Sequence, residues 1–222
     1  MIQLNTFKRN VYSQGGEDGI IDKIFSSLDI RQGNYVEIGA DDGMEISNTR
    51  LLREKGWKGV LIEGSSRFIK LQDNVKNAEL VNKYVSCEDG DRMDDILAET
   101  SLPKDFEFMS LDIDGNDLWV WESMVLYRPL VMCVEYNYTL KESLTIAYDQ
   151  NHRWKQDNYY GATAAAFCKL AKDKGYDLIA FTPFLNLFFI DKDQDHPFQV
   201  LNPDAIPTGK GWKQSERLMV SY

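Results

Sequence analysis

Tyr35-Val36-Glu37-Ile38-Gly39-Ala40-Asp41-Asp42-Gly43 carries the strongest structural signal in this chain of 222 residues. An apolar, β-prone run ends there at a turn that is bounded by glycines and rich in carboxylates. Twenty residues after Gly43, a second β-prone run ends at Glu63. A strand, a glycine turn, a helix and a second strand with a terminal carboxylate form the half-site in which α/β proteins bind a nucleoside. The stretch therefore predicts a ligand that contains a nucleoside.

The carboxylates of this turn distinguish between two kinds of cofactor. A dinucleotide needs bare backbone N–H groups and a helix N-terminus for its pyrophosphate. Asp41 and Asp42, with Glu37 just before them, would repel those phosphates at close range. S-adenosylmethionine has no phosphate, its sulfonium and ammonium groups suit an acidic turn, and its ribose diol suits Glu63. The sequence thus favours S-adenosylmethionine; the alternative is a turn whose acidic tip is simply solvated.

The composition is that of a globular protein with an acidic balance. Hydrophobic residues make up 43%, charged residues 27%, and the formal net charge is -10. Nucleic acids and anionic membranes are bound through basic faces, so neither is expected as a partner. The three cysteines, Cys87, Cys133 and Cys168, lack close pairing, which indicates buried thiols in a reducing compartment.

No targeting or membrane segment is apparent. The first residues lack the apolar core of a signal peptide, and no apolar run approaches the roughly 20 residues that span a bilayer. We therefore expect a cytoplasmic protein. Residues 1–222 are expected to form one domain, either alone or as part of a longer chain.

Strand and helix signals alternate along the chain, which predicts a mainly parallel sheet with helices on both faces. Helices are expected at residues 16–28, 47–55, 91–100, 118–127 and 162–174, and from residue 65 onward. Parallel strands are expected at residues 35–38, 59–63, 78–85, 106–112 and 130–135. Two further strands, at 176–182 and 186–190, should pair as an antiparallel hairpin. This order predicts a seven-stranded, Rossmann-like α/β sheet of the class I methyltransferase fold, with the run at 217–220 covering an edge.

A second group of polar residues marks the ends of two neighbouring strands. Asp112 and Asp114 follow one predicted strand, and Glu135 and Asn137 follow the next. The carboxyl ends of neighbouring parallel strands share one crevice, so these oxygens should converge beside the glycine turn. Hard divalent cations such as Mg²⁺, Mn²⁺ or Ca²⁺ prefer such a set. We expect all four residues to bind a metal; the alternative is that Asp112 holds an amide or ammonium group while the others are solvated.

Five motifs make the chain resemble the FkbM-type family of S-adenosylmethionine-dependent methyltransferases. They are Tyr12-Ser13-Gln14-Gly15-Gly16-Glu17-Asp18, the stretch at 35–43, Ser47-Asn48-Thr49, Glu63, and Leu111-Asp112-Ile113-Asp114-Gly115. The likeness spans roughly residues 12–190. It departs from the family at the fourth strand, where Ser-Leu-Asp-Ile-Asp-Gly replaces Lys-Ile-Asp-x-Glu-Gly.

The resemblance implies methyl transfer to a hydroxyl group, often on a sugar, with help from a divalent cation such as Mg²⁺ or Mn²⁺. It also implies which residues line the cofactor pocket. This expected cofactor-binding set, completed from the glycine turn and the strand ends, is Gln14, Glu37, Gly39, Ala40, Asp41, Gly43, Asn48, Glu63, Gly64, Ser86, Cys87 and Asp112. Asp94 is a further candidate at the adenine, unless it only begins a helix.

Residues 136–160 are polar and aromatic, and they follow the strand end where an acceptor should enter. The chain has two histidines, and His152 lies in this segment. We expect His152 to act as the catalytic base, with Asp112 holding a metal that lowers the pKa of the acceptor hydroxyl. Lys141 and Asp149 are alternative bases, and a solvated His152 is the alternative to any such role. His196 is expected to be structural.

Flat rings with polar edges suit the faces of sugars. Four rings of this segment are therefore expected to bind the acceptor: Tyr136, Tyr138, Trp154 and Tyr159. The alternative is that they cover the cofactor pocket.

The residues thus predict a metal-assisted O-methyltransferase that uses S-adenosylmethionine on a sugar or glycan, with a small-molecule or oligosaccharide acceptor. Two other classes remain open. One is an NAD(P)-dependent sugar-modifying oxidoreductase, and the other is a non-catalytic S-adenosylmethionine-binding domain of a glycan-assembly protein.

Overall fold

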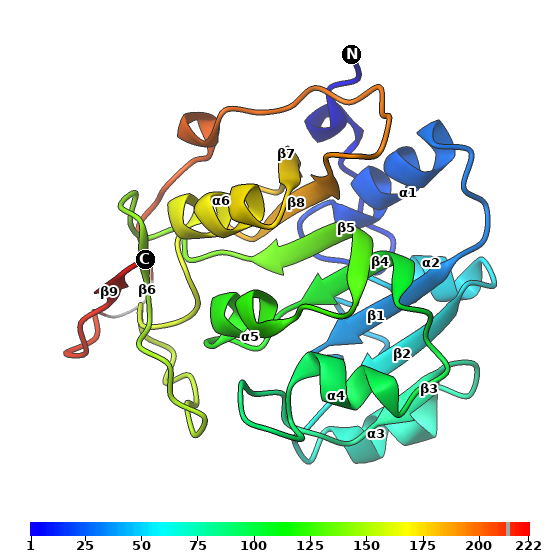
Figure 1. The fold of residues 1–222 in the computed structure, drawn as a ribbon, viewed down its shortest axis with the longest axis horizontal. Helices are drawn as coiled ribbons and strands as arrows, with labels where there is room; N and C mark the ends of the chain where they lie inside the picture. The colour runs from blue at the N-terminus through cyan, green and yellow to red at the C-terminus, as the bar shows by residue number, and fades with distance from the viewer. Residues whose placement is uncertain (212–213) are drawn as a thin grey trace.

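A seven-stranded sheet forms the centre of the molecule, in the order β3-β2-β1-β4-β5-β8-β7 (Figure 1). The computed structural model describes residues 1–211 and 214–222. Five strands are parallel: β1 (Asn34–Ile38), β2 (Lys58–Ile62), β3 (Glu79–Val81), β4 (Asp105–Leu111) and β5 (Arg128–Glu135). The hairpin of β7 (Tyr176–Phe181) and β8 (Asn186–Asp191) completes the sheet, with β8 antiparallel to both neighbours. This order and these directions confirm the predicted class I methyltransferase fold.

Helices cover both faces of the sheet. The helices α1 (Glu17–Ser27), α2 (Arg50–Glu54) and α3 (Phe68–Asn74) contribute to the core on one face, and α4 (Met93–Ala98), α5 (Asp117–Ser123) and α6 (Ala164–Asp173) to the core on the other. Strand residues alternate between the two cores, as Phe108 and Met109 of β4 do. This period of two with apolar residues on both sides is what a doubly covered parallel sheet requires.

The smaller elements lie outside this sandwich. Two short 3-10 helices are η1 (Leu4–Phe7) and η2 (Pro203–Ala205). The strands β6 (Leu144–Thr145) and β9 (Val220–Ser221) form a separate two-stranded sheet, so the C-terminal run pairs with the segment after β5 and not with the main sheet. In Figure 1 that segment and β9 lie side by side, beyond the carboxyl ends of the central strands. In the described part of the chain, no helix combines the length and apolar character that crossing a bilayer needs.

Several elements are shorter than the sequence predicts. The sequence predicts a helix from residue 47, whereas α2 begins at Arg50, since residues 47–49 bind the carboxylate of Glu37. It predicts a third strand to residue 85, whereas β3 ends at Val81 and residues 83–85 line a cavity instead.

Asp94 explains why α5 ends at Ser123 and not at the predicted residue 127. Its buried carboxylate accepts the backbone N–H groups of three consecutive residues at 2.8–3.2 Å: Val125, Leu126 and Tyr127. These amides can no longer join a helix, and the chain turns into β5. Asp94 therefore fixes a connection between elements from the first turn of α4, and it lines none of the cavities described below.

Two buried carboxylates explain the motif near the N-terminus. Asp18 accepts the backbone N–H groups of residues 11–13. One carboxylate oxygen of Glu17 accepts a hydrogen bond from the N–H of Gly15. The other oxygen accepts hydrogen bonds from the Thr182 hydroxyl at 2.7 Å and from Asn186 Nδ2 at 3.1 Å. The motif thus ties the N-terminal segment to the β7–β8 turn.

Candidate functional site

A cavity of about 540 Å³ opens where β1, β2 and β4 end. Ligand sites for small molecules typically measure roughly 300–1,000 Å³. Of the residues that the sequence predicts for binding or catalysis, eight line it: Gly39, Asp41, Glu63, Gly64, Asp112, Asp114, His152 and Trp154. The strands bring the first six together, and the segment after β5 supplies the last two.

Gly39 lets the ends of β1 and β4 approach each other. Its φ is +79°, and a Cβ atom there would lie 1.8 Å from the carbonyl oxygen of Asp112. Only glycine fits this backbone without displacing β4. Its N–H donates to the carbonyl of Ile62 at 3.0 Å, so the same residue also ties the turn to β2.

Glu63 holds the next part of the turn. Its two carboxylate oxygens accept the backbone N–H of Asp41 at 2.9 Å and that of Ser65 at 2.7 Å. The side chain of Asp41 pairs with Arg67 at 3.2 Å, and burial raises the pKa of Asp41. Asp42 points elsewhere, because its carboxylate accepts the amides of residues 44 and 45. Only the first carboxylate of the turn therefore lines the cavity.

A second, smaller cavity of about 60 Å³ shares walls with the first, among them Gly39, Asp41 and Asp112. Ala40, Glu37 and Asn48 also line it. The Glu37 carboxylate accepts Ser47 Oγ, Asn48 N and Thr49 Oγ1 at 2.7–2.8 Å. Burial raises the pKa of Glu37, and these hydrogen bonds act against that rise. The Ser-Asn-Thr triplet is thus anchored by Glu37 of β1.

Three carboxylates gather beside the large cavity. Asp112, Asp114 and Glu135 can each place an oxygen within 4.8 Å of the others. No hydrogen bond or cationic side chain from the described residues offsets their charge. Burial and mutual repulsion raise the pKa of Asp112 and of Glu135 well above the usual range, and burial together with the nearby Asp117 raises the pKa of Asp114 to about 6.

A tight turn presents Asp114 to this cluster. Asp117, which is buried, accepts the N–H of Ile113 with one oxygen and that of Gly115 with the other, each at 2.8 Å. Asp114 between them has φ of +55°, a region that few residues other than glycine adopt. The turn is therefore built by side-chain contacts, and its strained residue carries a cluster carboxylate.

Asn137 does not join the cluster, although the sequence predicts it as a ligand. Its Nδ2 donates to the carbonyls of Asn158 and Tyr160, and its Oδ1 accepts the N–H and the hydroxyl of Thr139. The amide is fully buried and occupied by its own loop. We therefore leave Asn137 out of the ligand set.

Of the four predicted acceptor rings, Trp154 lines the cavity. Tyr136 is fully buried, and its hydroxyl accepts the N–H of Phe184 and donates to the carbonyl of Pro207. The hydroxyl of Tyr159 accepts the N–H of Ala147, and the ring of Tyr138 packs edge-on against that of Phe184. These three rings hold the segment after β5 in place and do not line the cavity.

His152 lies in the cavity wall with both ring nitrogens engaged. Nε2 is 3.0 Å from the carbonyl oxygen of Asp114, and Nδ1 is 3.5 Å from Nη1 of Arg217. Burial lowers the pKa of His152, and the charge of Arg217 lowers it further. In this arrangement the ring offers no free lone pair to an acceptor hydroxyl. The other histidine, His196, stacks on the ring of Phe198 and accepts its N–H.

Other predicted cofactor residues lie apart from both cavities. Gln14 is exposed, and Gly43 packs against Leu71 of α3. The backbone N–H of Cys87, next to Ser86, donates to the hydroxyl of Tyr148. The wall at that position is instead formed by Tyr84 and Val85, which lie inside the strand that the sequence predicts but beyond the end of β3 at Val81. Further wall residues that the sequence did not single out are Ile46, Arg67, Lys83, Asn116 and Arg153.

No protein-family model matches this sequence, and no curated protein does. Solved structures resemble the fold. The 1,6-didemethyltoxoflavin-N1-methyltransferase of Burkholderia thailandensis is 13% identical, with 78% of this chain and 76% of that chain covered and a TM-score of 0.48. The glycopeptide N-methyltransferase MtfA is 12% identical, with 84% and 90% covered and a TM-score of 0.46.

A SAM-dependent methyltransferase from Aquifex aeolicus is 11% identical, with 71% of this chain and 80% of that chain covered and a TM-score of 0.41. Similarity at this level carries no information about activity. The strand order and directions define the fold.

Proposed function

We propose that this protein is an S-adenosylmethionine-dependent O-methyltransferase that acts on a sugar or glycan hydroxyl with the help of a divalent cation. The donor part of the proposal is supported by the glycine turn. Four carboxylates line the cavity, those of Asp41, Glu63, Asp112 and Asp114, against three cationic side chains, those of Arg67, Lys83 and Arg153. The first helix after the turn, α2, begins only at Arg50, so no helix N-terminus directly follows Gly43. A pyrophosphate would lack its usual partner there, whereas a sulfonium and an ammonium group would be stabilised.

The cation part is carried by one observation, the carboxylate cluster without a neutralising partner. Two unit charges 4.8 Å apart repel by about 3 kcal/mol at the effective dielectric constant of such sites. Three acidic oxygens at this spacing suit a hard divalent cation. Such a cation, held by Asp112, Asp114 and Glu135, would lower the pKa of an acceptor hydroxyl.

The residues of the chain suggest how transfer proceeds. Asp112 lines both cavities and belongs to the cluster, so it stands where donor and acceptor would meet. Trp154 also lines the large cavity and offers its ring to the acceptor there. The acceptor oxygen attacks the methyl carbon in line as the carbon–sulfur bond breaks, and positioning supplies most of the rate. Because His152 is engaged at both nitrogens, we assign the hydroxyl proton to the carboxylates of the cluster.

Calorimetric titration separates the donor classes. We expect S-adenosylmethionine and S-adenosylhomocysteine to bind and NAD⁺ not to. The variant Glu63→Ala should weaken S-adenosylhomocysteine binding about tenfold or more, because one carboxylate anchors both the turn and the predicted ribose contact. Binding of NAD⁺ in place of S-adenosylhomocysteine would favour the oxidoreductase.

The acceptor and the cation are tested together. Free sugars and nucleotide sugars are incubated with methyl-labelled donor in Mg²⁺, Mn²⁺ or chelator. We expect turnover with a cation and its loss in chelator and in Asp112→Asn, while the exposed Asp195→Asn serves as the matched control. Turnover that survives both changes would remove the cation from the proposal. Donor binding without transfer to any acceptor would favour a non-catalytic domain.

A further inference from the structure

We infer that Arg217, from the C-terminal tail, is a positioning residue for the carboxylate cluster: it sets the tautomer of His152, and His152 in turn holds the backbone of Asp114. The contacts themselves are independent of the proposed function, whereas the consequence for cation binding rests on it. Nothing in the sequence motifs points to this residue, because the tail lies outside the stretch that carries the family resemblance.

The guanidinium of Arg217 meets three groups of the segment after β5. Nη1 lies 3.5 Å from His152 Nδ1, and Nη2 lies 3.4 Å from Asp157 Oδ2. The charged group also sits over the ring of Tyr159, 4.1 Å from its centre. The side chain of Asp157 is 13% exposed and that of Arg217 is 34% exposed, so the ion pair is half-buried. A planar, forked cation can satisfy these partners at the same time, which a lysine ammonium cannot do as well.

The partners of the imidazole ring fix where its proton lies. Arginine only donates hydrogen bonds, so Nδ1 of His152 must accept from Arg217. Nε2 must then carry the hydrogen and donate to the carbonyl oxygen of Asp114 at 3.0 Å. Without Arg217, the opposite tautomer becomes accessible, and its Nε2 would face the same carbonyl without a hydrogen to donate.

The ring is fitted closely to the turn that it holds. A Cβ atom at Gly115 would lie 2.3 Å from Cδ2 of His152, so the ring packs directly on the Asp114–Gly115 backbone. Asp114 has φ of +55°, a conformation that surrounding contacts must maintain. The hydrogen bond from His152 is one such contact. A change at Arg217 can therefore reach the Asp114 carboxylate through a single intervening side chain.

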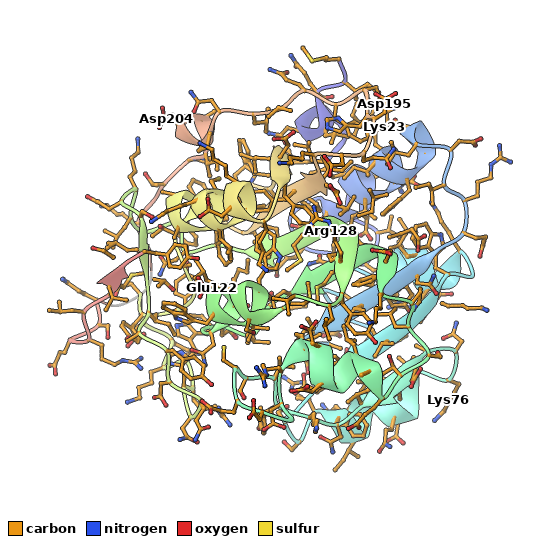
Figure 2. The ribbon with its side chains drawn as sticks, in the orientation of Figure 1. Lys23, Lys76, Glu122, Arg128, Asp195 and Asp204 are labelled. Carbon is orange, nitrogen blue, oxygen red and sulfur yellow. The ribbon has the colours of Figure 1, made fainter. Side chains whose placement is uncertain are left out.

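The tail is fastened on both sides of Arg217. Before it, the N–H of Ser215 donates to Asn158 Oδ1 at 2.6 Å. After it, β9 pairs with β6, and the hydroxyl of Tyr222 donates to Glu122 Oε1 at 2.7 Å. Figure 2 labels Glu122 on α5, on the body of the molecule. Arg217 is thus held in place by the fold, as a positioning residue must be.

Nitrogen-15 NMR reads the tautomer directly, because the chain contains only two histidines, His152 and His196. Long-range proton–nitrogen spectra are recorded for metal-free protein without donor, and His196→Gln assigns the signals. We expect the Nε2–H tautomer of His152 in the wild type, a mixture of tautomers in Arg217→Ala, and partial recovery in Arg217→Lys. Arg9→Ala, which removes a surface arginine paired with Asp22 at 3.5 Å, should change nothing.

A second readout connects the tautomer to the cluster. We expect Mn²⁺ affinity, measured by electron paramagnetic resonance, to fall about tenfold in Arg217→Ala and to stay unchanged in Arg9→Ala. If Arg217→Ala folds poorly, Asp157→Asn weakens the same anchor more gently and should shift the tautomer in the same direction. A wild-type Nδ1–H tautomer, or a spectrum that neither variant alters, would overturn the inference. Failure of the wild type to bind Mn²⁺ would instead count against the proposed cation. The NMR test of the tautomer would remain valid, because it uses metal-free protein.

Discussion

At the scale of single residues, Asp114 shows how a site can be held at the expense of stability. It adopts a strained backbone conformation, and its carboxylate lies among two others. Its pKa is raised to about 6 from an ordinary value of 3.8. The folded protein therefore binds the proton of Asp114 more tightly than the unfolded chain does. This contribution to stability is complete below pH 3.8 and is lost as the pH rises through about 6.

The variant Asp114→Asn should accordingly stabilise the metal-free protein at pH 7.5. The gain is at most about 3 kcal/mol, since each tenfold change in proton affinity corresponds to about 1.4 kcal/mol. The advantage over the wild type should vanish near pH 4, where the aspartate is protonated, and Mn²⁺ should reverse the order at pH 7.5. Chemical unfolding at the two pH values measures this difference. Equal stability of the two proteins at pH 7.5 would contradict it, and Asp195→Asn controls for net charge.

The sequence located the cluster but not all of its neighbours. Strand ends can be read from apolar runs, which placed Asp112 and Glu135 on adjacent strands. Asn137 lies beyond the end of β5, where loop geometry decides the direction of a side chain. The partner of His152, Arg217, is 65 residues further along the chain, a contact that no local pattern encodes.

At the scale of elements, short side chains decide where helices end. The periodicity of apolar residues extends a helix to residue 127, but Asp94 offers its backbone amides a better acceptor. The same competition delays α2 until Glu37 has bound residues 47–49. Periodicity indicates which residues face the core, but it contains no information about side chains that bind backbone amides. The types of the elements were therefore predictable and their ends were not.

Asp94→Ala tests this view of the α5–β5 connection. It leaves three backbone N–H groups without their acceptor, and hydrogen bonds to a charged group are worth about 1.5–3 kcal/mol each. We expect a loss of about 3 kcal/mol or more in the free energy of unfolding and a smaller loss in Asp94→Asn. Denaturant unfolding measures both. Asp95→Ala removes a partly exposed carboxylate that pairs with Arg92 and accepts one exposed backbone N–H, that of Gly90, so it should lose about 1 kcal/mol, and a similar loss in both variants would argue against the capture.

At the scale of the whole molecule, contacts between distant parts of the chain complete the fold. The order of apolar runs predicts the central sheet, because alternation of strands and helices leaves few topologies once crossovers are right-handed. It does not predict the contacts that tie the N-terminal and C-terminal segments to the rest of the molecule. Glu17 binds residues 165 and 169 positions away, and the tail reaches back to β6 and α5.

Glu17→Ala should therefore weaken the molecule globally although it changes one residue near the N-terminus. It removes the acceptor of Gly15, Thr182 and Asn186 within a fully buried site. Unpaired buried donors cost about 1–3 kcal/mol each, and for a protein of this size 1 kcal/mol corresponds to roughly 2–4 °C. We expect the melting temperature to fall by about 5–15 °C.

Glu99→Ala, at an exposed position on the end of α4, should change it by less than about 2 °C. Calorimetry gives both values, and amide exchange should show the β7–β8 turn opening with the N-terminal segment. Faster exchange at only one of the two would mean that Glu17 does not couple them.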